Sequence, residues 1–137
     1  MDTLFDWTES DSVKIGVLDD QHKKLFDIVN ELFAAMNTMR GRDILEEILQ
    51  RLEHYAATHF EMEESLMAKH DFPELASHRS AHQAMREKVL SFKKQLDAGS
   101  SNNVAPELLV YLQHWLRNHI RVIDQRYSAF LNARGLH

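Results

Sequence analysis

Apolar positions recur at spacings of three and four residues along most of this chain, the pattern of helices packed against one another. Short turn signals divide the pattern into four stretches, at residues 19–39, 44–69, 73–97 and 106–133. Helices of this length with short connections predict an all-α fold, an up-down-up-down antiparallel four-helix bundle. Residues 1–17 lack the periodicity and are expected to form an irregular N-terminal arm, so that residues 1–137 make a single domain.

Single residues mark the predicted helix ends. Asp43 is a suitable N-cap for the second helix. Pro73 and Pro106 suit the first turns of the third and fourth helices, because proline lacks the N–H that a first turn leaves unpaired. Gly41 and Gly135 are placed as stops after the first and fourth helices.

Histidine occupies positions that should belong to the core. In the third helix the predicted buried seam runs through Leu75, His78, His82, Met85, Val89, Phe92 and Leu96. Three more histidines take inward positions on the other helices: His22, His59 and His119. One such residue is ordinarily a hydrogen-bonded core imidazole. Five unpaired ones would cost ~1–3 kcal/mol each, so five across all four helices indicate a shared metal centre.

Depth along the bundle supports this interpretation. In an antiparallel bundle the starts of the first and third helices lie level with the ends of the second and fourth, so all five inward histidines map to one end. The other four histidines fall on polar faces, in a turn or at the terminus and are expected at the surface: His54, His70, His114 and His137.

The acidic run after His59 contains one residue on the inward face. Glu63 follows His59 by four residues, so the two side chains project from the same side of the helix. Glu61 points to the opposite side. Glu64 lies on a flank and is taken as a solvated residue, although spacing alone leaves it open.

Asp124 follows His119 by five residues, which places it about 140° away around an α-helix. That offset is poor for two ligands of one ion but workable for an aspartate that reaches sideways to a second. Five histidines and two carboxylates exceed the needs of one ion and suit two bridged ions with one open position. The ligand mix favours iron, and the spacing is also compatible with zinc, manganese or cobalt.

Two known metal patterns do not occur in the sequence. The chain has no Glu-x-x-His pair of the ferritin-like di-metal type and no H-E-x-x-H zinc-protease pattern. With fewer anionic ligands, high-valent iron is stabilised less well, and this favours the binding of dioxygen over its cleavage.

Composition narrows the function classes. Zero cysteines exclude disulfides and thiolate ligands and fit a reducing compartment. The acidic start MDTLFDWTES lacks the layout of a signal peptide, and no apolar run approaches the ~20 residues of a membrane span. A net charge of -5 without a basic face argues against nucleic acid as a partner.

Four segments resemble the bacterial hemerythrins of the hemerythrin family. They are DDQHKKLF at 19–26, HFEMEE at 59–64, HRSAH at 78–82 and HWLRNHIRVID at 114–124. They follow the family order across nearly the whole chain, and their combined spacing is specific. The resemblance implies a non-haem di-iron centre that binds dioxygen reversibly, with two iron ions (Fe2+/Fe3+) joined by an oxo or hydroxo bridge.

The same resemblance implies a role for each ligand. Three histidines would hold one iron: His78, His82 and His119. Two would hold the other iron and leave it an open position: His22 and His59. Two carboxylates would bridge both ions: Glu63 and Asp124. An apolar pocket for oxygen would be lined by Leu25, Phe60, Trp115, Leu116 and Ile120.

We therefore expect a non-enzymatic, monomeric protein that stores or delivers dioxygen in the cytoplasm, with no membrane partner. One alternative is an oxygen- or redox-sensing module, which would need a separate partner protein because the chain ends about where the bundle ends. Iron storage or detoxification would use the same residues. No further acid, base or substrate-sized polar pocket is apparent in the sequence, so no catalytic residue is expected.

Overall fold

The computed structural model describes residues 5–36, 41–99 and 101–137, and within these ranges it contains helices and connections but no strand. A short 3-10 helix, η1 (Glu9–Asp11), precedes the bundle. The long helices are α1 (Gly16–Ala35), α2 (Gly41–Lys69), α3 (Leu75–Asp97) and α4 (Ser101–Trp115). A π-helix, η2 (Leu116–Ile123), and α5 (Gln125–Asn132) then continue the line of α4.

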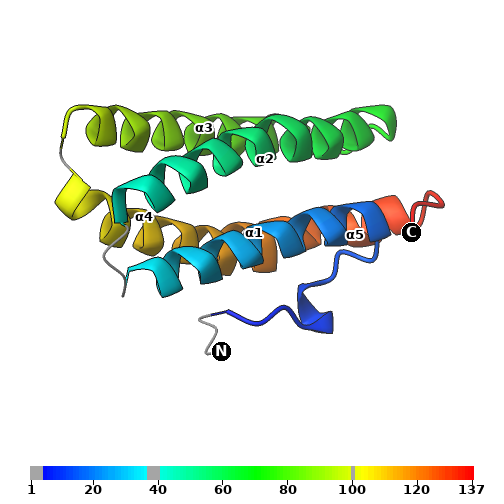
Figure 1. The fold of residues 1–137 in the computed structure, drawn as a ribbon. Coiled ribbons are helices and arrows are strands. Elements are labelled where there is room, and N and C mark those ends of the chain that lie inside the picture. Colours follow the sequence, from blue (N-terminus) through cyan, green and yellow to red (C-terminus); the bar gives the residue numbers. More distant parts are fainter. Residues whose placement is uncertain (1–4, 37–40, 100) are drawn as a thin grey trace.

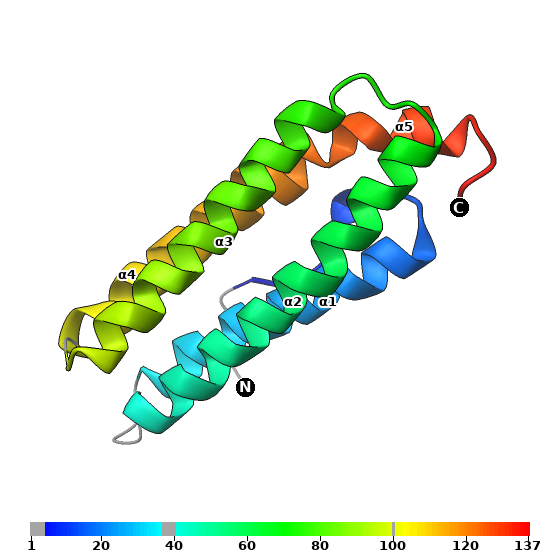
Figure 2. The same cartoon turned by 90° about the horizontal axis from the view of Figure 1, so that it is seen from above.

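The elements form four rods, because α4, η2 and α5 run on as one (Figure 1). Around the bundle α1 contacts α2, α2 contacts α3, α3 contacts α4 and α4 contacts α1 (Figure 2). Consecutive rods run in opposite directions. The predicted all-α, up-down-up-down four-helix bundle is therefore confirmed.

Several helix ends differ from the predictions. The first helix begins at Gly16 and so takes in the last residues assigned to the arm, while its predicted end at residues 37–39 lies outside the described residues. Asp43 lies in the first turn of α2 instead of capping it. The third helix begins at Leu75, two residues after Pro73, with Glu74 as its N-cap.

The fourth rod differs most from its predicted range of 106–133. It begins at Ser101, and Pro106 lies inside α4, where it removes one backbone hydrogen bond instead of marking the start. Val104 is fully buried in the core, which explains why the helix extends upstream of the proline. Gly135 has a φ of +90°, in agreement with a stop after α5.

The arm is fixed to the bundle by polar contacts. Asn30 on α1 exchanges two hydrogen bonds with the backbone of Phe5, at 2.9 and 2.7 Å. Asp19 accepts hydrogen bonds from the backbone N–H of Val13 and the hydroxyl of Ser12, which holds the chain just before α1. These bonds fix the approach to the first turns of α1.

Two apolar clusters fill the bundle. The larger one occupies most of its length, and the smaller one lies at the end where α2 meets α3, around Leu18, Met67 and Phe72. No helix within the described ranges combines the length and the apolar composition that crossing a bilayer requires.

Candidate metal centre

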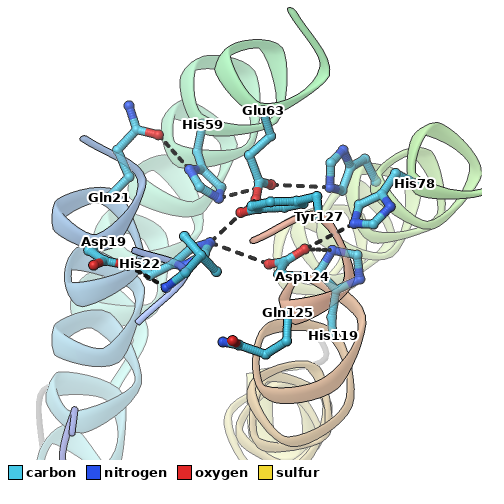
Figure 3. A network of polar contacts seen from close by, with 12 residues as sticks. Asp19, Gln21, His22, His59, Glu63, His78, His119, Asp124, Gln125 and Tyr127 are labelled. Carbon is cyan, nitrogen blue, oxygen red and sulfur yellow. Dashed lines mark hydrogen bonds and ion pairs between the residues drawn. The ribbon is translucent and has the colours of Figure 1, made fainter. Parts of the chain in front are cut away.

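Seven polar side chains meet between the two apolar clusters. Each is at most 3% exposed, and they come from all four rods: His22, His59, Glu63, His78, His82, His119 and Asp124. Every helix carries its polar members between a residue of the larger cluster and one of the smaller. On α1, for example, His22 lies between Leu25 and Leu18. The structure thus brings together all seven sequence-predicted residues, and Figure 3 labels all of them except His82.

Glu63 faces histidines from three helices. Its carboxylate oxygens lie 3.0 Å from Nε2 of His59, 3.4 Å from Nε2 of His82 and 3.5 Å from Nε2 of His22. The predicted shared face of His59 and Glu63 on α2 is present, and the contacts reach across to α1 and α3.

Asp124 makes the matching set of contacts from the other side (Figure 3). Its oxygens lie 3.0 Å from Nε2 of His119, 3.2 Å from Nε2 of His78 and 3.3 Å from Nε2 of His22. Like Glu63, Asp124 contacts histidines from three different rods of the bundle. The two carboxylates therefore lie between the histidines, with imidazole nitrogens around them.

The π-helix η2 explains how Asp124 shares a face with His119. The backbone N–H of Asp124 donates to the carbonyl of His119 at 2.7 Å, an i to i+5 bond. Residues five apart are then stacked one above the other, whereas an α-helix would separate them by about 140°. The offset of about 140° considered from the sequence therefore does not apply, because it assumed α-helical geometry. Single π turns of this kind occur frequently at functional sites.

Several inward-facing atoms of this group lack a hydrogen-bond partner among the described residues. They are Nε2 of His22, His82 and His119, Oε1 of Glu63 and Oδ2 of Asp124. They approach one another at ion-pair distances but without hydrogen-bond alignment. Burying such atoms unsatisfied is costly, and a shared cation removes the cost because all of them are metal-ligand atoms. The residues present therefore fit a metal centre.

The atoms that could bind a metal divide into two groups that share Glu63. In one, atoms of Glu63, His82, His119 and Asp124 all lie within 4.8 Å of one another, and in the other, atoms of His22, His59 and Glu63 do so. His78 lies outside both groups and joins the first through Asp124, at 3.2 Å. Two overlapping groups suit two ions better than one.

The electrostatics of the site are dominated by its two carboxylates. Burial lowers the pKa of His22, but the contacts with Asp124 and Glu63 raise it to about 10. Burial would raise the pKa of Glu63, and the contacts with His59, His22 and His82 hold it well below its usual range. Burial and the charge of Glu63 would likewise raise the pKa of Asp124, and the contacts with His119 and His22 lower it below its usual range.

Three further residues contact the group, and the sequence interpretation did not assign them to it. Nδ1 of His59 donates to the amide oxygen of Gln21 at 2.5 Å (Figure 3). Nδ1 of His82 donates to the carboxylate of Glu64 at 2.9 Å. The hydroxyl of Tyr127, which is fully buried, donates to Glu63. Acceptors on Nδ1 leave the Nε2 lone pairs free to face inward.

Glu64 is therefore no solvated residue. Its side chain is 17% exposed and reaches from α2 to α3, whereas Glu61 is exposed as expected. The contact between Glu64 and His82 depends on how α3 packs against α2. In the sequence, the position of Glu64 on the flank of its helix was the one feature that could have indicated it.

The five residues predicted to line an oxygen pocket are all buried in the larger apolar cluster. Two of them stack on histidines of the buried group: Phe60 on His82 and Trp115 on His119, both with ring centroids 3.9 Å apart. The centre is thus covered on this side by buried aromatic rings.

The remaining histidines lie away from the centre. His54, His114 and His137 are exposed, and His70 is half-buried in the turn after α2. His54 lines a cleft of about 520 Å³ between α1 and α2 that also reaches Gln21 and His59. The expectation that these four stand outside the buried group agrees with their positions.

Comparison with known proteins gives consistent matches over this same region. The hemerythrin HHE cation binding domain matches residues 13–131. A bacteriohemerythrin of Methylococcus capsulatus is 31% identical, over 95% of this chain and 98% of its own length. A hemerythrin-like protein of Naegleria gruberi is 32% identical, over 93% of both chains.

Solved structures agree with these sequence matches. The crystal structure of wild-type hemerythrin superimposes with a TM-score of 0.80 at 30% identity, covering 93% of this chain and 98% of that chain. A leucine-to-alanine mutant of hemerythrin gives a TM-score of 0.82 at 28% identity, covering 95% and 98%. With its domain pattern, its relatives and its fold in agreement, the chain belongs to the hemerythrin family.

Proposed function

We propose that this protein binds dioxygen reversibly at a di-iron centre and thereby stores or delivers it. One observation carries the proposal: Glu63 and Asp124, fully buried, each contact histidines on both sides of the centre. Two carboxylates in that position are suited to bridge a pair of ions. The unsatisfied imidazole nitrogens around them are suited to complete the coordination of those ions.

The ligand assignment follows the two groups of atoms. One iron would take the three-histidine set, His78, His82 and His119, and the other would take the two-histidine set, His22 and His59. Glu63 belongs to both groups of close atoms and Asp124 contacts His22 across the divide, which supports a bridging role for each. With one histidine fewer, the two-histidine side would keep a position for oxygen.

Imidazole and carboxylate ligands in this number suit iron. When bound, the pair of irons supplies the electrons by which oxygen is held. The protein's part is to fix the ligands and exclude water. Gln21 and Glu64 orient two histidines through Nδ1, and the Tyr127 hydroxyl donates a hydrogen bond to Glu63, one of the two carboxylates proposed as bridges.

The apolar side of the centre favours carriage over catalysis. The pocket residues Leu25, Phe60, Trp115, Leu116 and Ile120 are all buried. Apart from the indole N–H they offer no polar group, and none of them can supply a proton for cleavage of the O–O bond. Such a wall also keeps water and anions from displacing oxygen, which should slow oxidation of the oxygenated form.

The test is the optical spectrum of the iron-loaded protein as oxygen is added and removed. A charge-transfer band that appears with oxygen and disappears under vacuum supports the proposal, and irreversible oxidation with product release argues for an enzyme. His22→Ala should abolish the band, because it removes a buried ligand. The matched control His54→Ala, on an exposed histidine, should retain it.

A further inference from the structure

The outer nitrogens of two ligand histidines bind chemically different partners. On the two-histidine side, Nδ1 of His59 donates to the neutral amide of Gln21 at 2.5 Å. On the three-histidine side, Nδ1 of His82 donates to the carboxylate of Glu64 at 2.9 Å. The two sides of the centre therefore differ in charge as well as in the number of histidines.

Glu64 is held in this position by contacts to both of its oxygens. Oε2 accepts from His82, and Oε1 lies 3.4 Å from Nε of Arg79, one turn earlier on α3. The arginine is 57% exposed, so this ion pair orients Glu64 more than it stabilises the fold. The bond from His82 is part-buried, since the imidazole is fully buried and the Glu64 side chain is 17% exposed.

Two of the remaining outer nitrogens do not cancel this difference. Nδ1 of His22 and Nδ1 of His78 have no hydrogen-bond partner among the described residues. Gln21 lines the cleft between α1 and α2 together with His59, which places it near solvent. Its amide carries no charge, so the partner of His59 is a neutral acceptor.

A carboxylate that accepts the N–H of an imidazole raises the basicity of that ligand, and a neutral amide does so less. A more basic ligand stabilises the more highly charged state of the ion it binds. We infer that Glu64 is a positioning residue that lowers the reduction potential of the iron held by His82, so that the two irons differ in how readily they are oxidised. This inference rests on the proposed di-iron function.

The experiment is a redox titration of the iron-loaded protein that compares Glu64→Gln with Glu61→Gln. Both variants remove one negative charge from α2, but only Glu64 touches a ligand histidine. Glutamine at position 64 keeps an acceptor for His82, so a merely structural role would leave the potential unchanged. A tenfold loss of affinity, the lower end for such outer partners, raises the potential by about 59 mV in Glu64→Gln when it falls on the oxidised iron alone.

A reciprocal variant strengthens the comparison. Gln21→Glu places a carboxylate on the outer nitrogen of His59 and should lower the potential of the other iron. Equal potentials for Glu64→Gln and Glu61→Gln, with oxygen binding intact, would overturn the inference and leave the proposed function standing. A shift in potential without reversible oxygen binding would overturn the function alone, and a protein that takes up no iron would refute both.

Discussion

Glu63 should be the residue whose loss damages the centre most, and Glu63→Gln is the perturbation that shows it. The substitution keeps the size and one acceptor oxygen but removes a buried charge that faces His22, His59 and His82 at 3.0–3.5 Å. Because Glu63 belongs to both groups of close ligand atoms, we expect the variant to lose the ability to hold two irons. The iron content should fall to one ion or less per chain.

The magnitude in the metal-free protein follows from burial. Removing one partner of a buried ion pair typically costs about 3–5 kcal/mol. The cost is limited because the pKa of His22, raised to about 10 by Asp124 and Glu63 against burial, falls once Glu63 is neutral, and the imidazole can then lose its proton. The pKa of Glu63 is lowered by its histidine contacts, so this stability is present at neutral pH and is lost as the pH falls through that value.

The assay is denaturant unfolding of metal-free protein at pH 7 beside iron analysis of the loaded protein. The matched control is Glu61→Gln, the same change on an exposed residue of the same helix, which should shift stability by no more than about 0.5 kcal/mol. If Glu63→Gln unfolds like the control and retains two irons, the bridging assignment is wrong.

Three further outcomes follow from the same contacts. Tyr127→Phe removes the hydroxyl that donates to Glu63 and should weaken iron binding about 10–100-fold, as measured by competition with a chelator; unchanged affinity would show that the bond is passive. Loading metal-free protein with iron(II) at pH 7 should release protons, because His22, with its pKa raised to about 10, must give one up. Affinity should then rise about tenfold per pH unit for each proton displaced, and a pH-independent affinity would contradict this. Phe60→Ala should destabilise the protein by about 3–5 kcal/mol in denaturant unfolding and speed autoxidation, since it removes the ring that stacks on His82. The control is Leu90→Ala, on an exposed residue. Effects as small as those of the control would show that the Phe60 ring does not protect the centre.

The bundle could be predicted from the sequence because helical periodicity is a local signal repeated over many residues. The same periodicity placed five histidines inward and at one depth, where the structure has them. Pro106 was misplaced because its position inside α4 depends on tertiary contacts, such as the burial of Val104, that override local preference.

The details of the site were harder to predict, for two physical reasons. The π-helix around His119 has no local sequence signal, and only the five-residue spacing to Asp124, combined with a requirement that both face one centre, would have indicated it. The contacts of Glu64 and Tyr127 join different helices. They depend on how the rods are rotated and set against one another, which a sequence pattern does not specify.

In the proposed function a pair of irons acts as one oxygen site. Its most direct test is the stoichiometry of oxygen uptake, measured by gas exchange on reduced protein of known iron content. We expect one dioxygen bound per two irons and full recovery of that oxygen when the pressure is lowered. Uptake of one dioxygen per iron, or consumption of oxygen without recovery, would contradict it.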